Sequence, residues 1–439
     1  MNRRHFVSTA AAPLAASLAQ AQPARKPNII FILADDLGYG DLGCYGSKEI
    51  HTPAVDQLAA EGLRFTQAYA GSTVCAPSRC TLMTGFHTGH CRVRGNIEPQ
   101  IPLRESDVTV AELLKRAGYR TGMFGKWGLG EPYSTGIPSR KGFDEFFGYL
   151  DQTHAHNYWT DTLWENQTQV WLQGNFGGQN KQYSHDVIAQ RGLEFLEKSG
   201  DQPFFLYLPY TIPHSRWDPP SLEPYAKEDW PDQKKKIAAM ITRMDTDIGK
   251  LMATLKRKGL DENTLVIFAS DNGPVPVSAK LLKSGGPLRG VKRDMYDGGI
   301  RVPFIARWTG RIKPGAASDH VIAFWDLLPT ACELAGVPSP AGIDGISYLP
   351  TLLGKPQKQH EHLYWEFYER GFTQAARMGD WKAVRNGPGK PLEIFNLRGD
   401  PGEQHELAAS HPEIVARMEQ IIKTAHTPSD IWPVKRPPA

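Results

Sequence analysis

The sequence has few cysteines, little net charge and no apolar run long enough to cross a membrane. A membrane-spanning helix takes about 20 apolar residues, and no run of that length follows the N-terminal region. Five cysteines among 439 residues are too few for a disulfide scaffold, and their odd number leaves at least one thiol unpaired. A net charge of +3 gives no strong electrostatic footprint for nucleic acid or a membrane surface. What remains is a globular chain with one large domain or two unequal ones.

Residues 1–21 have the pattern of a secretory signal peptide. A charged start is followed by a short Ala-rich apolar segment and an Ala-Gln-Ala end. Arg3 and Arg4, with Phe6 nearby, favour the twin-arginine type, which exports folded proteins, over an ordinary secretory signal. Cleavage would remove both arginines and lower the net charge from +3 to +1. We therefore expect an exported bacterial protein, periplasmic or secreted.

The other motifs in the sequence are best interpreted together with the motif Cys75-Ala76-Pro77-Ser78-Arg79. Pro77 suits the first turn of a helix, where its missing N–H and fixed φ cost nothing, so Cys75 is predicted just before a helix N-terminus. Free N–H groups and the positive end of the helix dipole would face a bound anion there. Arg79, one turn on, can point its guanidinium at the same place. The alternative is a cysteine that only fills a small apolar space.

The motif resembles the modification motif of the formylglycine-dependent sulfatases. In that family the cysteine, here Cys75, is oxidised by a formylglycine-generating enzyme, and the hydrated aldehyde is the nucleophile. The resemblance extends over nearly all of the chain that follows the signal peptide. It implies an α/β fold of the alkaline phosphatase-like type, with a large mixed, mostly parallel sheet flanked by helices and a smaller C-terminal antiparallel-sheet α+β domain.

Oxygen-bearing side chains follow two predicted strands at 28–33 and 265–269. Both strands are short apolar runs with β-branched residues, as in buried parallel sheets. Each pair of polar residues that follows is also compatible with a simple polar turn. If the strands are neighbours, however, the side chains converge at the carboxyl edge of the sheet, where they suit Ca²⁺ or Mg²⁺ better than zinc. The resemblance implies that these residues and Cys75 hold the metal, usually calcium. They are Asp35, Asp36, Asp271 and Asn272.

Three basic side chains are expected beside these metal ligands. Predicted strands at 119–124 and 204–208 lead toward a lysine and a histidine. A Pro/Gly-rich stretch over 273–299 is too long for a simple connection, and we expect it to be a substrate-facing loop that carries a second lysine. The resemblance implies that both lysines bind sulfate oxygens with Arg79, and that the histidine lies near the leaving group. These side chains are Lys126, His214 and Lys292.

The chain after residue 360 predicts a small separate unit. We expect a catalytic domain over 22–360 and a C-terminal domain over 361–439, and the latter resembles the small sulfatase domain with a helix covering an antiparallel sheet. Within the catalytic domain, one amphipathic helix that ends at Gly259 is predicted before the strand at 265–269. The expected C-terminal elements are strands at 363–367, 372–378, 381–384 and 392–396 and a helix at 412–426.

Two positions depart from the family pattern. Family members usually carry a histidine two residues after the lysine, and here that position is Gly128. Either His154 or His156 takes its place, or the step proceeds without a histidine. Phe86 stands where many members have arginine, which weakens the expectation that the cysteine is converted.

We therefore expect hydrolysis of a sulfate ester to an alcohol and sulfate. A carbohydrate sulfate is the predicted substrate, with aryl sulfates accepted in vitro. Two alternatives stay open: a phosphate or phosphonate ester hydrolase of the same superfamily, and a protein that binds sulfated glycans without cleaving them. Four aromatic residues after the first lysine have two interpretations, sugar stacking and core packing. They are Tyr158, Trp159, Trp164 and Trp171.

Overall fold

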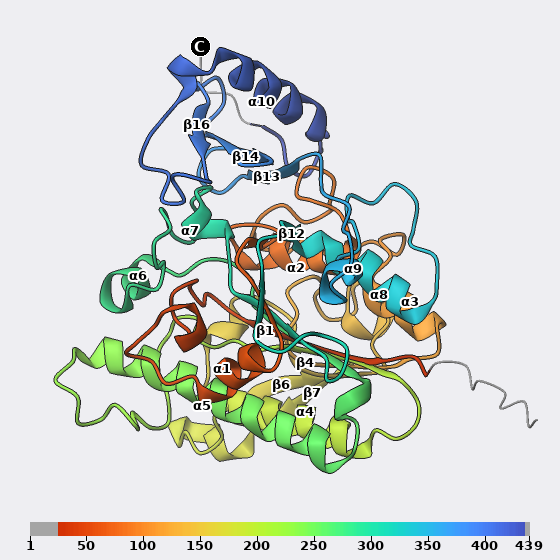
Figure 1. Ribbon diagram of the computed structural model, residues 1–439. Coiled ribbons are helices and arrows are strands. Elements are labelled where there is room, and N and C mark those ends of the chain that lie inside the picture. The colour runs from red at the N-terminus through yellow and green to blue at the C-terminus, as the bar shows by residue number, and fades with distance from the viewer. Residues whose placement is uncertain (1–24, 435–439) are drawn as a thin grey trace, which may run out of the picture.

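A ten-stranded mixed sheet forms the centre of the computed structural model, which describes residues 25–434 (Figure 1). The predicted signal peptide lies outside the described residues. The strand order is β11-β2-β10-β9-β1-β8-β4-β5-β6-β7, and the five strands from β9 to β5 are mutually parallel. The strands are β1 (Asn28–Ala34), β2 (Leu63–Phe65), β4 (Arg120–Lys126), β5 (Glu145–Tyr149), β6 (Thr162–Glu165), β7 (Thr168–Trp171), β8 (Phe204–Pro209), β9 (Thr264–Ser270), β10 (Phe304–Arg307) and β11 (Ala316–Ser318).

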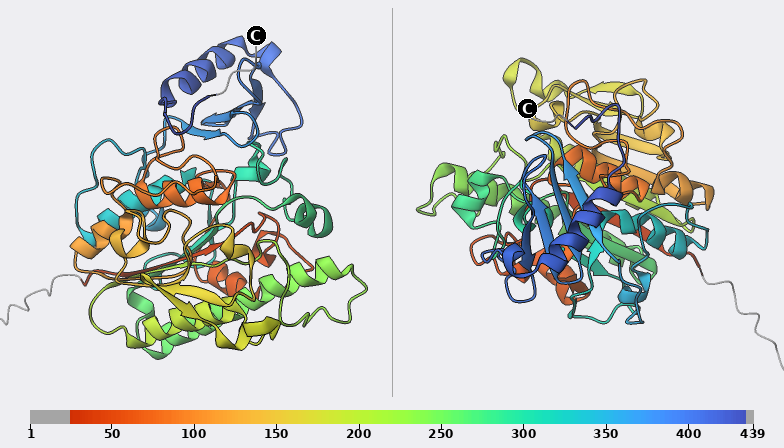
Figure 2. Two further views of the ribbon diagram at one scale, coloured as in Figure 1. Left: turned by 180° about the vertical axis from the view of Figure 1, so that it is seen from behind. Right: turned by 90° about the horizontal axis from the view of Figure 1, so that it is seen from above.

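Both faces of this sheet are buried under helices, as a parallel sheet requires. Along β1, alternate side chains enter two separate apolar cores. One core packs under α1, α4 and α5, and the other under α2, α3 and α8, so the sheet is the middle layer of three (Figures 1 and 2). The helices are α1 (Pro53–Ala60), α2 (Cys75–Thr84), α3 (Val110–Arg116), α4 (Ser184–Lys198), α5 (Asp232–Arg257), α6 (Pro276–Leu282), α7 (Asp297–Ile300), α8 (Leu327–Ala335) and α9 (Leu349–Leu352). A small parallel pair joins β3 (Ala68–Tyr69) to β12 (Ile322–Ala323).

The C-terminal part is a four-stranded antiparallel sheet covered by one helix. The apolar side chains of the helix pack on one face of the sheet. The other face rests on residues of the larger part, among them Tyr69, Val74 and Trp325. This small sheet therefore lies between its own helix and the main body (Figure 1). Its elements are β13 (Leu363–Phe367), β14 (Thr373–Met378), β15 (Trp381–Arg385), β16 (Glu393–Asn396) and α10 (Pro412–Ala425).

The expected fold class is confirmed, and the predicted elements agree with the observed ones to within about two residues, the usual uncertainty of element ends. The stretch at 273–299 differs, because it contains two short helices, α6 and α7, where we expected only a loop. The domain boundary at residue 360 stays a prediction. No helix among residues 25–434 combines the length and the apolar character needed to cross a membrane.

A buried ion cluster ties the C-terminal sheet to the main body. Lys382 on β15 is fully buried, and its Nζ lies 2.7 Å from Asp297 Oδ1 and 2.9 Å from Glu403 Oε1. Burial would raise the pKa of Asp297, but the Lys382 charge holds it down at about 2. Burial raises the pKa of Glu403 to about 7 despite the same lysine. The single ammonium is therefore shared by two buried carboxyl groups.

Replacing this lysine should strongly destabilise the protein. Lys382→Met removes the cation and leaves two buried acids without it, so we expect a loss of about 3–5 kcal/mol in the free energy of unfolding. Urea or thermal unfolding measures the change. Lys423→Met, on the exposed face of α10, is the control and should change stability by less than about 0.5 kcal/mol. Equal stability of the two variants would show that the cluster contributes nothing.

Candidate active site

The polar residues predicted from four strand ends do meet at the carboxyl edge of the sheet. β1 pairs in parallel with β9, with Ala34 opposite Ser270, so Asp35 and Asp271 emerge side by side. β8 and β4 lie on the other side of β1 and bring in His214 and Lys126. This is the edge at which α/β sheets bind ligands.

Helix α2 enters this edge with its N-terminus. Cys75 is its first residue, one position further into the helix than expected, and all ten residues of α2 are buried. Arg79 lies one turn later on the same side. Its guanidinium donates to Asp271 Oδ2 at 2.8 Å, to Asp35 Oδ2 at 3.2 Å and to the Lys126 carbonyl at 2.6 Å. Arg79 thus holds the ends of β1, β9 and β4 together.

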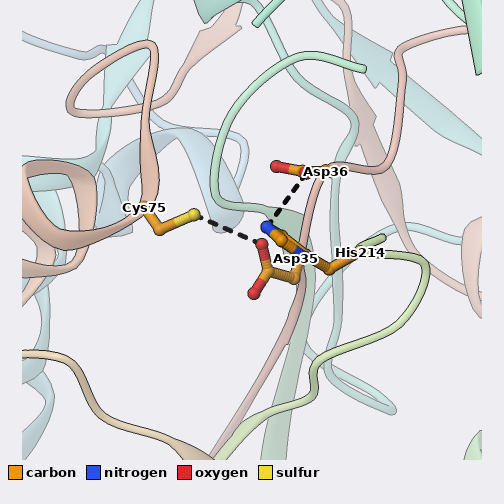
Figure 3. Close-up of side chains that lie close together, drawn as sticks. All are labelled: Asp35, Asp36, Cys75 and His214. Carbon is orange, nitrogen blue, oxygen red and sulfur yellow. Dashed lines mark hydrogen bonds and ion pairs between the residues drawn. The ribbon is translucent and has the colours of Figure 1, made fainter. Parts of the chain in front are cut away.

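Four side chains that could ligate a metal lie close together (Figure 3). Asp35, Asp36, Cys75 and His214 each place one ligand atom within 4.8 Å of the others, and all four are buried. Cys75 Sγ lies 3.4 Å from Asp35 Oδ1, and His214 Nε2 lies 3.5 Å from Asp36 Oδ2. Two carboxylates, a thiol and an imidazole are thus close enough together to hold one cation.

Two buried lysines also contact these carboxylates. Lys126 Nζ donates to Asp35 Oδ2 at 2.6 Å, and Lys292 Nζ donates to Asp36 Oδ1 at 2.5 Å. Lys292 Nζ also lies 3.5 Å from Cys75 Sγ. With Arg79, three buried cations therefore oppose three buried carboxylates.

The three carboxyl groups have different pKa values because their neighbours differ. Burial would raise the pKa of Asp35, but the charge of Lys126 above all holds it well below its ordinary value. At Asp36, burial would likewise raise the pKa, but the charge of Lys292 above all opposes it and the pKa is lowered. At Asp271, burial and the negative charge of Asp35 raise the pKa to about 6.

Burial is also the main cause of the pKa shifts of Cys75 and His214, which face the carboxylates. It raises the pKa of the Cys75 thiol far above its usual range, with a further contribution from the charge of Asp35. It lowers the pKa of His214 to about 4, against the opposing charge of Asp36. In this arrangement the thiol is neutral at pH 7, and a neutral thiol is a weak nucleophile.

Among the residues expected to hold the metal, two buried oxygen atoms have no hydrogen-bond partner in the described part of the chain. They are Asp36 Oδ2 and Asn272 Oδ1. Asn272 Nδ2 donates to Asp36 Oδ1 at 2.7 Å, which turns the amide oxygen away from that contact. Buried acceptors without donors are costly, and a hard cation would satisfy both. The residues present therefore fit a divalent metal.

A cavity of about 340 Å³ opens onto this cluster. Its wall includes Asp36, Cys75, His214 and Lys292 together with polar residues of the surrounding loops. The aromatic residues proposed for sugar stacking are not among its lining residues. Tyr158 is buried, and Trp171 is 59% exposed on β7.

The two candidate replacements for the missing histidine are placed differently. His156 lines the cavity, and its ring stacks on His214 with centroids 4.3 Å apart. His154 Nε2 instead contacts Thr160 Oγ1 at 2.7 Å, and His154 does not line the cavity. Gln152, which no sequence motif singled out, also lines the cavity.

All five cysteines are free thiols in the structure, which answers the pairing question that the sequence left open. Cys80, Cys91 and Cys332 are buried in the apolar core, and Cys44 is half-buried. Among the five, only Cys75 belongs to a cluster of possible metal ligands in the described structure.

The family model described as Sulfatase matches residues 27–337. The chain belongs to the sulfatase family. A second model, N-sulphoglucosamine sulphohydrolase, C-terminal, matches residues 291–427. As a family member, this sulfatase is a sulfuric ester hydrolase, and the alkaline phosphatase-like fold expected from its sequence is confirmed.

Relatives match the sulfatase over most of their length. Human arylsulfatase A is 34% identical, with 93% of this chain and 89% of the relative covered. N-acetylgalactosamine-6-O-sulfatase of Bacteroides thetaiotaomicron is 28% identical, with 92% and 94% covered. The crystal structure of Ps i-CgsB in complex with k-i-k-neocarrahexaose has a TM-score of 0.82 at 29% identity and covers 93% of this chain and 95% of its own. The phosphonate monoester hydrolase of Agrobacterium radiobacter shares the fold, with a TM-score of 0.69 at 20% identity and coverage of 94% and 100%.

The loop that carries His214 is held by one tyrosine. Tyr158 Oη lies 2.6 Å from the Thr211 carbonyl and 3.0 Å from the His214 carbonyl. We expect Tyr158→Phe to lower kcat/KM by about 5-fold, since losing the hydrogen bond that positions His214 costs about 1 kcal/mol. The control is Tyr183→Phe. Tyr183 stacks on Tyr158, and its buried hydroxyl has no hydrogen-bond partner among the described residues. Equal rates for both variants would contradict this role.

Proposed function

We propose that this sulfatase cleaves a carbohydrate sulfate ester with a formylglycine derived from Cys75 and a bound divalent metal. The observation that carries the proposal is the position of Cys75. It is the first residue of a buried helix, and its sulfur lies 3.4 Å from Asp35 Oδ1 and 3.5 Å from Lys292 Nζ. A structural cysteine needs none of these charged neighbours.

The proposed metal ligands are the oxygen-bearing residues at the ends of β1 and β9 and the modified residue 75. Calcium is the proposed ion and Mg²⁺ the alternative, because the donor set is made of oxygens. The unpartnered atoms Asp36 Oδ2 and Asn272 Oδ1 support this assignment. The metal would neutralise charge on the sulfate group. The protein ligands are Asp35, Asp36, Cys75 as formylglycine, Asp271 and Asn272.

The basic residues supply the remaining catalytic functions. A hydrated aldehyde at position 75 offers one hydroxyl to attack sulfur and a second to expel sulfate afterwards. Lys126, Lys292 and Arg79 offset the negative charge that would otherwise repel a nucleophile. His214, in the cavity wall, is the proposed proton donor to the alcohol oxygen as the S–O bond breaks. Burial lowers its pKa to about 4, so His214 can donate only after the negative charge of the bound ester has raised that pKa.

The proposed substrate is a sulfated carbohydrate, with aryl sulfates as laboratory substrates. Relatives named for a sulfated sugar and for aryl sulfates support both parts of this proposal. Polar residues at the cavity rim, including Asn96, Glu98 and Arg293, suit the hydroxyl groups of a sugar better than an apolar ligand. We further propose export to the periplasm or medium after a formylglycine-generating enzyme has modified Cys75.

The modification and the reaction can be tested together. In a host with the modifying enzyme, peptide mass spectrometry should show a loss of about 18 Da at Cys75, and 4-nitrophenyl sulfate should be hydrolysed. Cys75→Ala should abolish turnover and leave the fold intact. Cys332→Ala, which alters another buried thiol, should retain turnover.

Other results would point elsewhere. Full activity in Cys75→Ala would refute the mechanism. An intact thiol with no turnover would favour a sulfated-glycan binding protein, and faster hydrolysis of a phenylphosphonate ester would favour a phosphonate ester hydrolase.

The metal site predicts a measurable effect on stability. After chelator treatment, Ca²⁺ at 100 times its Kd should stabilise the fold by about 2.7 kcal/mol and restore turnover. Asn272→Ala should reduce both effects, because it removes one ligand oxygen. Asn28→Ala is the control, since Asn28 is a buried asparagine at the opposite end of β1 and donates to Thr264 Oγ1 at 3.1 Å. An unchanged melting curve with and without Ca²⁺ would exclude the site.

A further inference from the structure

Gly128 leaves a space that another side chain fills. Gly128 follows β4 and has a φ of 79°, in the left-handed region that glycine adopts without strain. A Cβ built on Gly128 would lie 1.8 Å from Gln152 Nε2 and 2.9 Å from Gln152 Cδ. The carboxamide of Gln152 therefore occupies the place where a side chain at position 128 would begin.

The backbone fixes this arrangement. Beyond the paired strands β4 and β5, Trp127 N donates to the Tyr149 carbonyl at 2.9 Å and Gly128 N donates to the Leu150 carbonyl at 3.0 Å. The turn that carries Gln152 follows two residues later. The two chain segments thus continue side by side past the end of the sheet, and Gln152 is held over Gly128.

The Gln152 carboxamide has no hydrogen-bond partner among the described residues. Both Nε2 and Oε1 are buried without one, and the whole residue is 8% exposed. Native proteins rarely leave a buried amide unsatisfied at both ends. Because Gln152 lines the same cavity as Cys75, His214 and Lys292, a ligand in that cavity can supply the missing partners.

We propose that Gln152 binds the sulfate ester, in the space that Gly128 leaves open. Its N–H groups donate to the sulfate group, and its carbonyl oxygen accepts from a hydroxyl of the bound reactants. This role rests on the proposed function. It gives the place of the missing family histidine to the neutral amide of Gln152 rather than to His154 or His156. Unlike a histidine, this amide does not titrate near neutral pH.

The test compares variants at position 152 with a matched glutamine. Gln152→Ala should lower kcat/KM for 4-nitrophenyl sulfate by about 10- to 100-fold, the cost of a hydrogen bond to a charged group. It should weaken the binding of inorganic sulfate to the calcium-loaded protein, measured by calorimetry, by about 10-fold. Gln100→Ala is the control, because Gln100 is a buried glutamine that donates to the Leu150 carbonyl but does not line the cavity. Its kcat/KM and sulfate affinity should match those of the wild type.

A second variant separates binding from folding. Gln152→Glu keeps the size of the side chain and adds a carboxylate that repels sulfate, so its activity should rise as pH falls and the acid is protonated. A purely structural role would not produce that pH dependence. Wild-type rates and sulfate affinity in both variants would overturn the proposal for Gln152 and leave the proposed function standing. If the wild type itself does not turn over, the proposed function fails, while calorimetry with sulfate still decides the role of Gln152.

Discussion

Three buried carboxylates at one edge of the sheet are the constraint on which the rest of the site depends. An isolated buried charge is too costly to persist, so each carboxylate needs a cation or several donors close by. Arg79 meets this need for two of them at once, since its Nη2 lies 3.2 Å from Asp35 Oδ2 and 2.8 Å from Asp271 Oδ2. The N-terminal turn of the buried helix α2 lies at this edge of the sheet, where it brings the Arg79 guanidinium to the ends of both strands.

The burial of these carboxylates at strand ends also explains which parts of the site could be predicted from the sequence. Asp35 and Asp271 each follow an uninterrupted apolar strand, and parallel pairing brings the ends of such strands together. The strands are buried on both faces, so their composition identified them without knowledge of the fold. In the C-terminal part the short strands and the helix were predicted from the sequence, whereas their assembly into an antiparallel sheet covered by the helix was implied by the family resemblance.

Other features depend on contacts that no local pattern encodes. Gln152 lies 24 positions after Gly128, and the two meet only because β4 and β5 pair in parallel with Lys126 opposite Tyr149. A glycine in a turn and a glutamine in a polar segment give no local signal of that contact. Likewise, α6 and α7 interrupt a stretch whose prolines and glycines predicted only a loop, since Pro276 begins a helix where its missing N–H costs nothing.

The two lysines show how the site can serve both metal and substrate. Their ammonium groups lie 2.6 Å from Asp35 and 2.5 Å from Asp36, on the carboxylates that we propose as metal ligands. A divalent cation bound there would compete for the same oxygens and weaken both lysine contacts. The long, flexible lysine side chains could then turn toward an anion in the cavity without moving the backbone. The ion pairs therefore stabilise buried carboxylates and hold, next to Cys75, the positive charge that a sulfate ester requires.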